Sequence, residues 1–251
     1  MKRFPERAVN NEEFEALDFH LAQNLAWDTD KRYIVFSAGS QAGKAVWGPK
    51  WLLREIYHPE IGRGGGDYLA VTATFDLFKL KMLPSMLNVF QRIYKVGKYW
   101  SYDKVIELKD PDTGEFWAKK SNDPMWGRII LRSADSSGGL EAATAKAVWA
   151  DEIGQDRFPR KSYSAIKRRI TIEKARVLMT TTLYEPGWFL YEVIRPAKNN
   201  QKEVFVDNKR GELSYVNNEK RDTFLLQFDS TINPSFDISE FKENQEHLDD
   251  E

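Results

Sequence analysis

The sequence contains no cysteine and only three histidines in 251 residues. Without thiols the chain can form no disulfide and no thiolate metal site, a composition typical of proteins in a reducing compartment. The histidines are scattered along the chain, so they form no recognisable metal-ligand pattern. These absences exclude a disulfide-stabilised scaffold and a zinc site of the Cys/His type.

Long apolar runs and an excess of one charge are also missing. No stretch approaches the roughly 18 apolar residues of a membrane span, and the start of the chain lacks the apolar core of a signal peptide. The 37 basic and 38 acidic residues leave a net charge of −1. A role in nucleic-acid binding would therefore require a local basic patch. We expect a soluble cytoplasmic protein with no membrane partner.

What is present is a globular composition, with 41% hydrophobic and 13% aromatic residues. This length and composition allow one large α/β domain or two small ones. Strands are expected at 67–74, 127–135, 175–182 and 223–229. A hairpin is expected over 105–119 with its turn at 110–114, and the polar stretch 197–222 is expected to be a hairpin or a loop.

The apolar run 33–36, which follows Lys31-Arg32, leads into small residues, then Gly43 and Lys44, then a helical pattern over 47–56. This strand–loop–helix order is the context of a phosphate-binding loop. Backbone N–H groups of such a loop surround phosphate oxygens, and Lys44 is the point charge for the outer phosphates. The candidate nucleotide contacts of the loop are Gly39, Ser40, Gln41, Ala42, Gly43, Lys44 and Ala45.

The loop departs from the usual pattern at two positions. Ala38 replaces the first glycine, with Gly39 one place later to supply the bend. Ala45 replaces the Ser or Thr whose hydroxyl normally binds Mg²⁺. Taken alone, the segment is equally compatible with an ordinary glycine-containing β–α turn.

A second chemical stretch, 145–152, is an apolar run that ends in Asp151 and Glu152. A buried parallel strand presents ligands at its carboxyl end. The first carboxylate of such a pair orients Mg²⁺, and the second takes a proton from the attacking water. A strand ending in two acids is common by itself. Combined with the Lys44 loop, it suggests a P-loop ATPase with a strand inserted between the two motifs.

Three weaker candidates accompany these motifs. An amphipathic helix expected over 11–26 carries Gln23, whose amide could contact an adenine edge or simply face solvent. His20, on the same helix, is expected at the surface. The hydroxyls of Thr180–Thr182 could touch the γ-phosphate or its water, although β-branched residues are also ordinary strand composition.

The most basic segment is a helical stretch expected to run from the end of the second strand to about residue 100. Its cations alternate with aromatic residues, as in contacts with a nucleic-acid backbone. A solvated helix face is the alternative. The candidate DNA contacts are Lys79, Lys81, Arg92, Lys95 and Lys98.

The motifs occur in a fixed order. They are Ala38–Lys44 with Gly48-Pro49 and Trp51-Leu52, Arg132–Ala134, Gly139–Glu141, Asp151-Glu152 with Gly154-Gln155, Thr180–Thr182 with Gly187-Trp188, and Asn233-Pro234. This combination resembles the ATPase region of tailed-phage large terminase subunits, over about residues 17–245. The resemblance implies an α/β P-loop NTPase fold of the ASCE type, with a mainly parallel central sheet flanked by helices. It implies an ATPase domain at 1–235 and a linker helix at 236–251 toward a nuclease domain beyond the chain.

The resemblance also implies roles for individual residues. Lys44 would hold the β- and γ-phosphates of ATP, Asp151 the Mg²⁺, and Glu152 would be the base. Thr181–Thr182 would belong to the coupling motif, and Gln23 would contact adenine.

Two positions depart from the family pattern besides Ala45. Ser40 stands where many relatives carry a loop arginine. Glu141 stands where some relatives place the arginine that a neighbouring subunit inserts, a group that stabilises charge on the γ-phosphate. Arg132, or else Lys146, is the substitute candidate.

The function implied is ATP hydrolysis coupled to translocation of double-stranded DNA into a procapsid. The implied partners are DNA, a portal protein and a small terminase subunit, in the host cell cytoplasm. The chain would form a ring on the capsid and be a monomer in isolation. Three alternatives stay open: a helicase-like ASCE ATPase, a nucleotide-binding module with weak or no hydrolysis because of Ala45, and a scaffold that binds portal or DNA without ATP.

Overall fold

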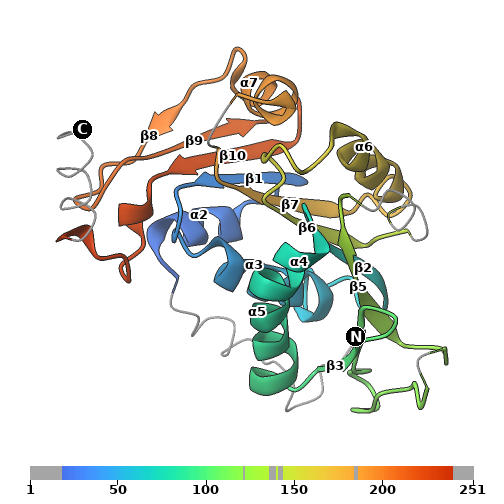
Figure 1. Ribbon diagram of the computed structural model, residues 1–251. Helices are drawn as coiled ribbons and strands as arrows, with labels where there is room; N and C mark the ends of the chain where they lie inside the picture. Colours follow the sequence, from blue (N-terminus) through green and yellow to red (C-terminus); the bar gives the residue numbers. More distant parts are fainter. Residues whose placement is uncertain (1–18, 121, 136–139, 141–143, 184–185, 240–251) are drawn as a thin grey trace.

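A computed structural model of the chain describes residues 19–120, 122–135, 140, 144–183 and 186–239. Its strands form one sheet in the order β3-β4-β5-β2-β6-β7-β1-β10-β9-β8 (Figure 1). The strands are β1 (Tyr33–Ala38), β2 (Gly66–Thr72), β3 (Gly97–Trp100), β4 (Val105–Leu108), β5 (Gly127–Ser133), β6 (Ala147–Asp151), β7 (Arg176–Thr181), β8 (Val204–Phe205), β9 (Leu213–Asn218) and β10 (Thr223–Phe228).

The centre of the sheet is parallel, from β5 through β2, β6, β7 and β1 to β10. The remaining pairings, at both ends, are antiparallel. This confirms the mainly parallel α/β sheet. The strand β7 lies between β1 and β6, so the expected inserted strand separates the two motifs.

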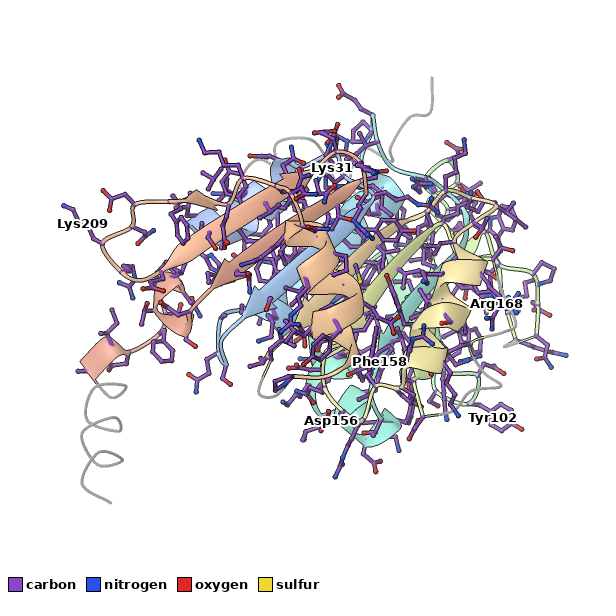
Figure 2. All side chains as sticks on the ribbon, turned by 90° about the horizontal axis from the view of Figure 1, so that it is seen from above. Lys31, Tyr102, Asp156, Phe158, Arg168 and Lys209 are labelled. Carbon is purple, nitrogen blue, oxygen red and sulfur yellow. The ribbon has the colours of Figure 1, made fainter. Side chains whose placement is uncertain are left out.

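Helices cover both faces of the sheet, as buried parallel strands require. They are α2 (Leu21–Asp28), α3 (Lys44–Tyr57), α4 (Phe75–Leu77), the π-helical turns η1 (Phe78–Met82) and η2 (Asn88–Ile93) around α5 (Leu83–Leu87), α6 (Arg160–Arg169), η4 (Leu190–Ile194), α7 (Arg195–Lys198) and the 3₁₀ turn η5 (Ser230–Ile232). One core forms under α2, α3 and α5, and a second under α6, η4 and α7. Figure 2, seen from above, shows α6 and α7 lying across the strands. No helix in the described part of the chain is long and apolar enough to cross a membrane.

The helix α3 approaches the sheet closely at Gly48. A Cβ there would lie 2.7 Å from Cδ2 of Trp149, and closer still to two other atoms of this fully buried ring. Trp149 cannot move aside easily, because its Nε1 donates a hydrogen bond to the Thr180 hydroxyl at 2.9 Å.

We expect Gly48→Ala to lower the free energy of unfolding by about 1–3 kcal/mol, the usual cost of overpacking. Denaturant titration measures the change. As a comparison, Gly187→Ala adds the same methyl group at a position without a positive φ, where the nearest atom, Asp156 Oδ1, is 3.7 Å away. An equal or smaller loss for Gly48→Ala would contradict the packing argument.

The expected long basic helix ends early. Helical structure stops at Ile93, Lys95 has a φ of +55°, and Lys98 lies on β3. The prediction was wrong because Gly97–Trp100 pairs with β4, placing Lys98 opposite Glu107. The helical spacing of side chains in the sequence continues past Ile93, but residues 97–100 form a strand because they pair with β4.

The expected hairpin over 105–119 is also wrong. The strand β4 pairs with β3 and β5, and residues 115–119 form no strand. Instead, the Asp110 and Glu107 carboxylates fix the loop: Asp110 accepts from Trp117 Nε1 at 3.0 Å, and Glu107 accepts from the Ala118 N–H at 2.7 Å.

Other boundaries follow the expectations more closely. The polar stretch 197–222 contains β8 and β9, and β9 forms a hairpin with β10. In the expected helix over 11–26, the described part begins at Leu21; residues 11–18 lie outside the described residues, as do 240–251 of the expected linker helix.

Candidate active site

The loop between β1 and α3 is held in an unusual backbone conformation. Gln41 and Gly43 have positive φ angles of 60° and 81°. The N–H of Gly39 donates to the Phe228 carbonyl at 3.2 Å, and a Cβ at Gly39 would be 3.0 Å from the backbone nitrogen of Ser230. The segment after β10 thus packs directly against the loop, and only a residue without a side chain fits at Gly39.

The Lys44 side chain, only 7% exposed, turns back toward this loop. Its Nζ donates to the carbonyl of Gly39 at 2.8 Å, to that of Ala38 at 3.2 Å, and to the Thr182 hydroxyl at 2.6 Å. Burial lowers the pKa of Lys44, and the charges of Glu152 and Asp151 oppose that shift. A buried ammonium enclosed by oxygen atoms is suited to receive phosphate oxygens.

Asp151, at the end of β6, is 3% exposed. Burial, reinforced by the charge of Glu152, raises the pKa of this carboxyl to about 6, and a hydrogen bond from Thr180 opposes the rise. That bond runs from Thr180 Oγ1 to Asp151 Oδ1 at 2.6 Å. Because Trp149 Nε1 donates to the same hydroxyl, the Thr180 proton is directed at the carboxylate.

Glu152 follows the strand in a left-handed conformation, with a φ of 53°. Non-glycine residues in this region occur at functional sites more often than elsewhere. Its Oε2 accepts hydrogen bonds from Gln155 Nε2 at 2.9 Å and from the Thr182 N–H at 3.1 Å. The carboxylate is therefore held at the end of the sheet by two donors.

The three threonines at the end of β7 connect these groups. Thr180 binds Asp151, Thr182 binds both Lys44 and Glu152, and Thr181 Oγ1 accepts from the Gly154 N–H at 3.0 Å. Thr181 and Thr182 were predicted as individual site residues, whereas Thr180 was predicted only as a member of the threonine run that could touch the γ-phosphate or its water. Its signal was the hydroxyl at the strand position paired with Asp151.

Lys44, Asp151 and Glu152 line one cavity of about 390 Å³. Its other walls are Ser40, Gln41, Ala42, Gly43, Ala45, Val46, Lys81, Thr182 and Asn233. Among the residues that the structure describes, no three His, Asp or Glu side chains gather as a complete metal site. One or two carboxylates together with substrate phosphates are, however, the usual ligands of Mg²⁺. The donors present therefore fit a magnesium–triphosphate, in which Asp151 would be the residue to bind the metal.

Gln23 and His20 lie behind the loop on the α2 side. A Cβ at Gly43 would be 3.0 Å from Gln23 Nε2, and His20 Nε2 lies 3.2 Å from the Ala42 carbonyl oxygen. Burial lowers the pKa of His20. His20 is therefore partly buried rather than at the surface, and adenine contact by Gln23 stays a prediction.

The two substitute candidates for the arginine finger do not line this cavity. Arg132 lies on β5 and donates to the neighbouring Leu131 carbonyl at 2.9 Å. Lys146 precedes β6, at the opposite edge of the sheet from Asp151, and its Nζ donates to the carbonyls of Arg63 and Gly65. Lys146 thus has a structural role, and Arg132 stays a prediction. Glu141 lies outside the described residues.

The candidate DNA contacts separate into three groups. Lys81 lines the cavity. Lys79 and Lys98 lie over the rings of Phe75 and Trp100, at 5.3 and 4.2 Å from the ring centroids. Among the described residues, Arg92 and Lys95 make neither contact and are exposed, as are Lys79 and Lys81. DNA binding by these residues stays a prediction.

Sequence reasoning missed the role of Asn233, although it noted the Asn233-Pro234 pair. Asn233 Nδ2 donates to the Gln41 carbonyl at 2.7 Å, and Ser230 Oγ donates to the Ser40 carbonyl. Arg210 in turn donates to the carbonyls of Thr231 at 2.9 Å and Phe236 at 3.3 Å. The turn after β10 therefore holds the loop between β1 and α3 through two hydrogen bonds to its carbonyl groups.

Comparison with solved structures gives several matches. The large terminase ATPase domain of Thermus phage P74-26 matches with a TM-score of 0.58 and 18% identity, over 76% of this chain and 74% of that one. The large terminase of the thermophilic bacteriophage D6E matches with a TM-score of 0.66 and 12% identity, over 91% of this chain. Its complex with ADP matches with a TM-score of 0.64 and 14% identity.

The chain spans 50% of the length of the D6E terminase. No protein-family model and no curated protein sequence matches it. At these identities the comparisons establish the fold. The chain has the mainly parallel α/β fold of these large terminase ATPase domains.

Proposed function

We propose that this chain is the ATP-hydrolysing domain of a viral DNA-packaging motor. The observation that carries the proposal is the convergence of Lys44, Asp151 and Glu152 on one cavity, from strands β1 and β6 that β7 separates. The likeness to terminase ATPase domains, one of them in complex with ADP, supports the same reading.

The residues divide the chemistry among them. Lys44 and the N–H groups of the loop bind the phosphates, and Asp151 would hold Mg²⁺, which would supply positive charge to the phosphate oxygens. Glu152 accepts a proton from water as the water oxygen bonds to the γ-phosphorus and the bond to the β-phosphate oxygen breaks. The products are ADP and inorganic phosphate.

The Thr180–Thr182 strand end is the proposed coupling element, because its residues form hydrogen bonds with Lys44, Asp151 and Glu152. Movement there would advance double-stranded DNA held through its backbone, without reading sequence. The exposed Arg92 and Lys95 are candidates for that contact. A portal protein, a small terminase subunit and neighbouring copies in a ring on the capsid are the proposed partners.

Release of inorganic phosphate tests the proposal, measured with Mg-ATP for the wild-type chain and Lys44→Ala, with and without duplex DNA. We expect release by the wild type, stimulation by DNA, and loss of nearly all release in the variant. Release that is unchanged in Lys44→Ala would contradict the assignment of the site. Strand displacement without any capsid component would favour a helicase-like ATPase instead.

A nucleotide-binding module is the second candidate, and Ala45 favours it. This residue lines the cavity at the first turn of α3 but offers no hydroxyl to Mg²⁺.

We expect Ala45→Thr to increase the apparent affinity for Mg²⁺ during ATP hydrolysis by about tenfold. This change corresponds to roughly 1.4 kcal/mol of binding free energy from one additional hydroxyl ligand. Magnesium titration of phosphate release measures it, with Ala45→Val as a control of equal shape. If only the threonine variant hydrolyses ATP, the natural chain is a binding module. If threonine and valine behave alike, the hydroxyl is not the missing ligand.

A further inference from the structure

Lys81, which was expected to contact DNA, is an exposed residue that lines the cavity containing Lys44. Lys81 lines the cavity together with Asp151 and Glu152. Its charge adds to the lowering of the Lys44 pKa, of which burial is the larger cause. Both lysines therefore line the cavity in which an anion would bind.

The fold fixes the end of the cavity that Lys81 reaches. Lys81 lies on η1, in the helical segment that follows β2, and β2 is the neighbour of β6 on the side away from β7. Lys81 thus approaches from the Asp151 side, whereas Asn233, after β10, approaches from the opposite side. In the proposed reaction, the carboxylate end is where the terminal phosphate and the attacking water lie.

The neighbouring side chains hold η1 in position. Phe78 and Met82 are fully buried in the core under α3 and α5. Residues two apart on a helix point in different directions. Accordingly, Lys79 lies over the Phe75 ring while Lys81 lines the cavity.

Lys81 balances the charges of the side chains that line the cavity. Without it, the lining would present one ammonium, on Lys44, and two carboxylates, on Asp151 and Glu152. A magnesium–triphosphate is itself an anion, so a lining with net negative charge would repel it. With Lys81 the acidic and basic groups of the lining balance.

We propose that Lys81 binds the terminal phosphate of ATP from within the same subunit. The inference rests on the proposed function and deepens it. Because ADP lacks that phosphate, Lys81 distinguishes ATP from ADP. It supplies part of the positive charge on the γ-phosphate before any neighbouring subunit contributes.

Calorimetric titration tests this, with ATP-γ-S and ADP as probes, each with Mg²⁺, on the wild type, Lys81→Ala and Lys81→Arg. We expect Lys81→Ala to weaken ATP-γ-S binding about tenfold, as for one lost charge-assisted hydrogen bond, and ADP binding less than about threefold. Lys81→Arg should recover most of the loss. The matched control is Lys167→Ala, an exposed helical lysine on α6 with its Nζ 4.8 Å from the Tyr163 ring centroid; it should match the wild type.

The outcomes separate this inference from the proposed function. If the wild type binds neither nucleotide, the proposed function fails and the inference fails with it. If the wild type binds both and Lys81→Ala equals Lys167→Ala, only the role of Lys81 is overturned. If Lys81→Ala weakens duplex DNA binding and leaves the nucleotide affinities unchanged, Lys81 is a DNA contact.

Discussion

Replacing Glu152 by glutamine is expected to reduce phosphate release by about 10²–10⁴-fold, the usual contribution of a general base. The glutamine amide would keep an oxygen to accept from the Thr182 N–H, which the Glu152 carboxylate accepts at 3.1 Å. The strand end and the phosphate loop should therefore keep their structure. The variant loses only the group that takes the proton.

Nucleotide binding separates this result from general damage to the site. We expect the dissociation constant for Mg-ATP to change by less than about threefold, since Glu152 acts on water and not on the nucleotide. Glu60→Gln, at an exposed position after α3, is the matched control and should hydrolyse ATP at the wild-type rate. Loss of binding in Glu152→Gln, or retention of hydrolysis, would contradict the assigned role.

Replacing Asp151 by asparagine is expected to abolish hydrolysis and, at the same time, to stabilise the fold. The pKa of Asp151 is raised to about 6 from 3.8 because the group is buried beside Glu152. A carboxyl with a raised pKa binds its proton more tightly in the folded state, so this group favours folding more as the pH falls through 6 toward 4. Above pH 7 the buried charge costs stability, by roughly 3 kcal/mol at most.

Asparagine removes that charge and keeps an oxygen for the Thr180 hydroxyl. At pH 8, with EDTA present, we expect the free energy of unfolding to rise by about 1–3 kcal/mol. At pH 5 the gain should be smaller, because Asp151 of the wild type is then largely protonated. Urea titrations at both pH values measure the difference.

Asp156→Asn is the control, five residues along the chain and exposed (labelled in Figure 2). It should change neither stability nor activity. A gain for Asp151→Asn that is equal at pH 8 and pH 5 would contradict the buried charge as its cause. A loss of stability at both would indicate that the carboxylate is essential to the fold.

The central sheet and the two main motifs were predictable from the sequence because each is a local pattern. Apolar runs of five or six residues mark β1, β6, β7 and β10, and the polar residues that follow them lie at one edge of a parallel sheet. The convergence of Lys44 with Asp151 followed from that rule alone, although the two are far apart in the chain.

The antiparallel edge was not predictable in the same way. Residues 105–119 contain two strand-like runs around a turn, yet the partner of β4 is Gly97–Trp100. A Gly97 Cβ would be 2.7 Å from Phe90 Cβ, so this glycine lets β3 pack against the end of the helical segment. Such a contact depends on tertiary packing that no short pattern contains.

The individual contacts of several site residues could not be predicted either. In the sequence, nothing distinguishes Lys81 from the other cations of its basic stretch. It lines the cavity because β2, which precedes its helical segment, lies beside β6 in the sheet. Thr180 and Thr182 belong to one predicted run, but each finds a different partner at the end of β7, Asp151 for the first and Lys44 for the second.

The turn after β10 gives the phosphate loop a mechanical connection to the chain that follows it. Arg210 donates a hydrogen bond to the Phe236 carbonyl, and Asn233 of the same turn donates to the Gln41 carbonyl, so a displacement of this turn would also displace the loop. A loop that rearranges around a triphosphate would displace the same turn in return. Linked binding equilibria are reciprocal. A partner that binds this turn more tightly when the loop holds ATP than when it holds ADP therefore raises the affinity of the loop for ATP relative to ADP by the same factor.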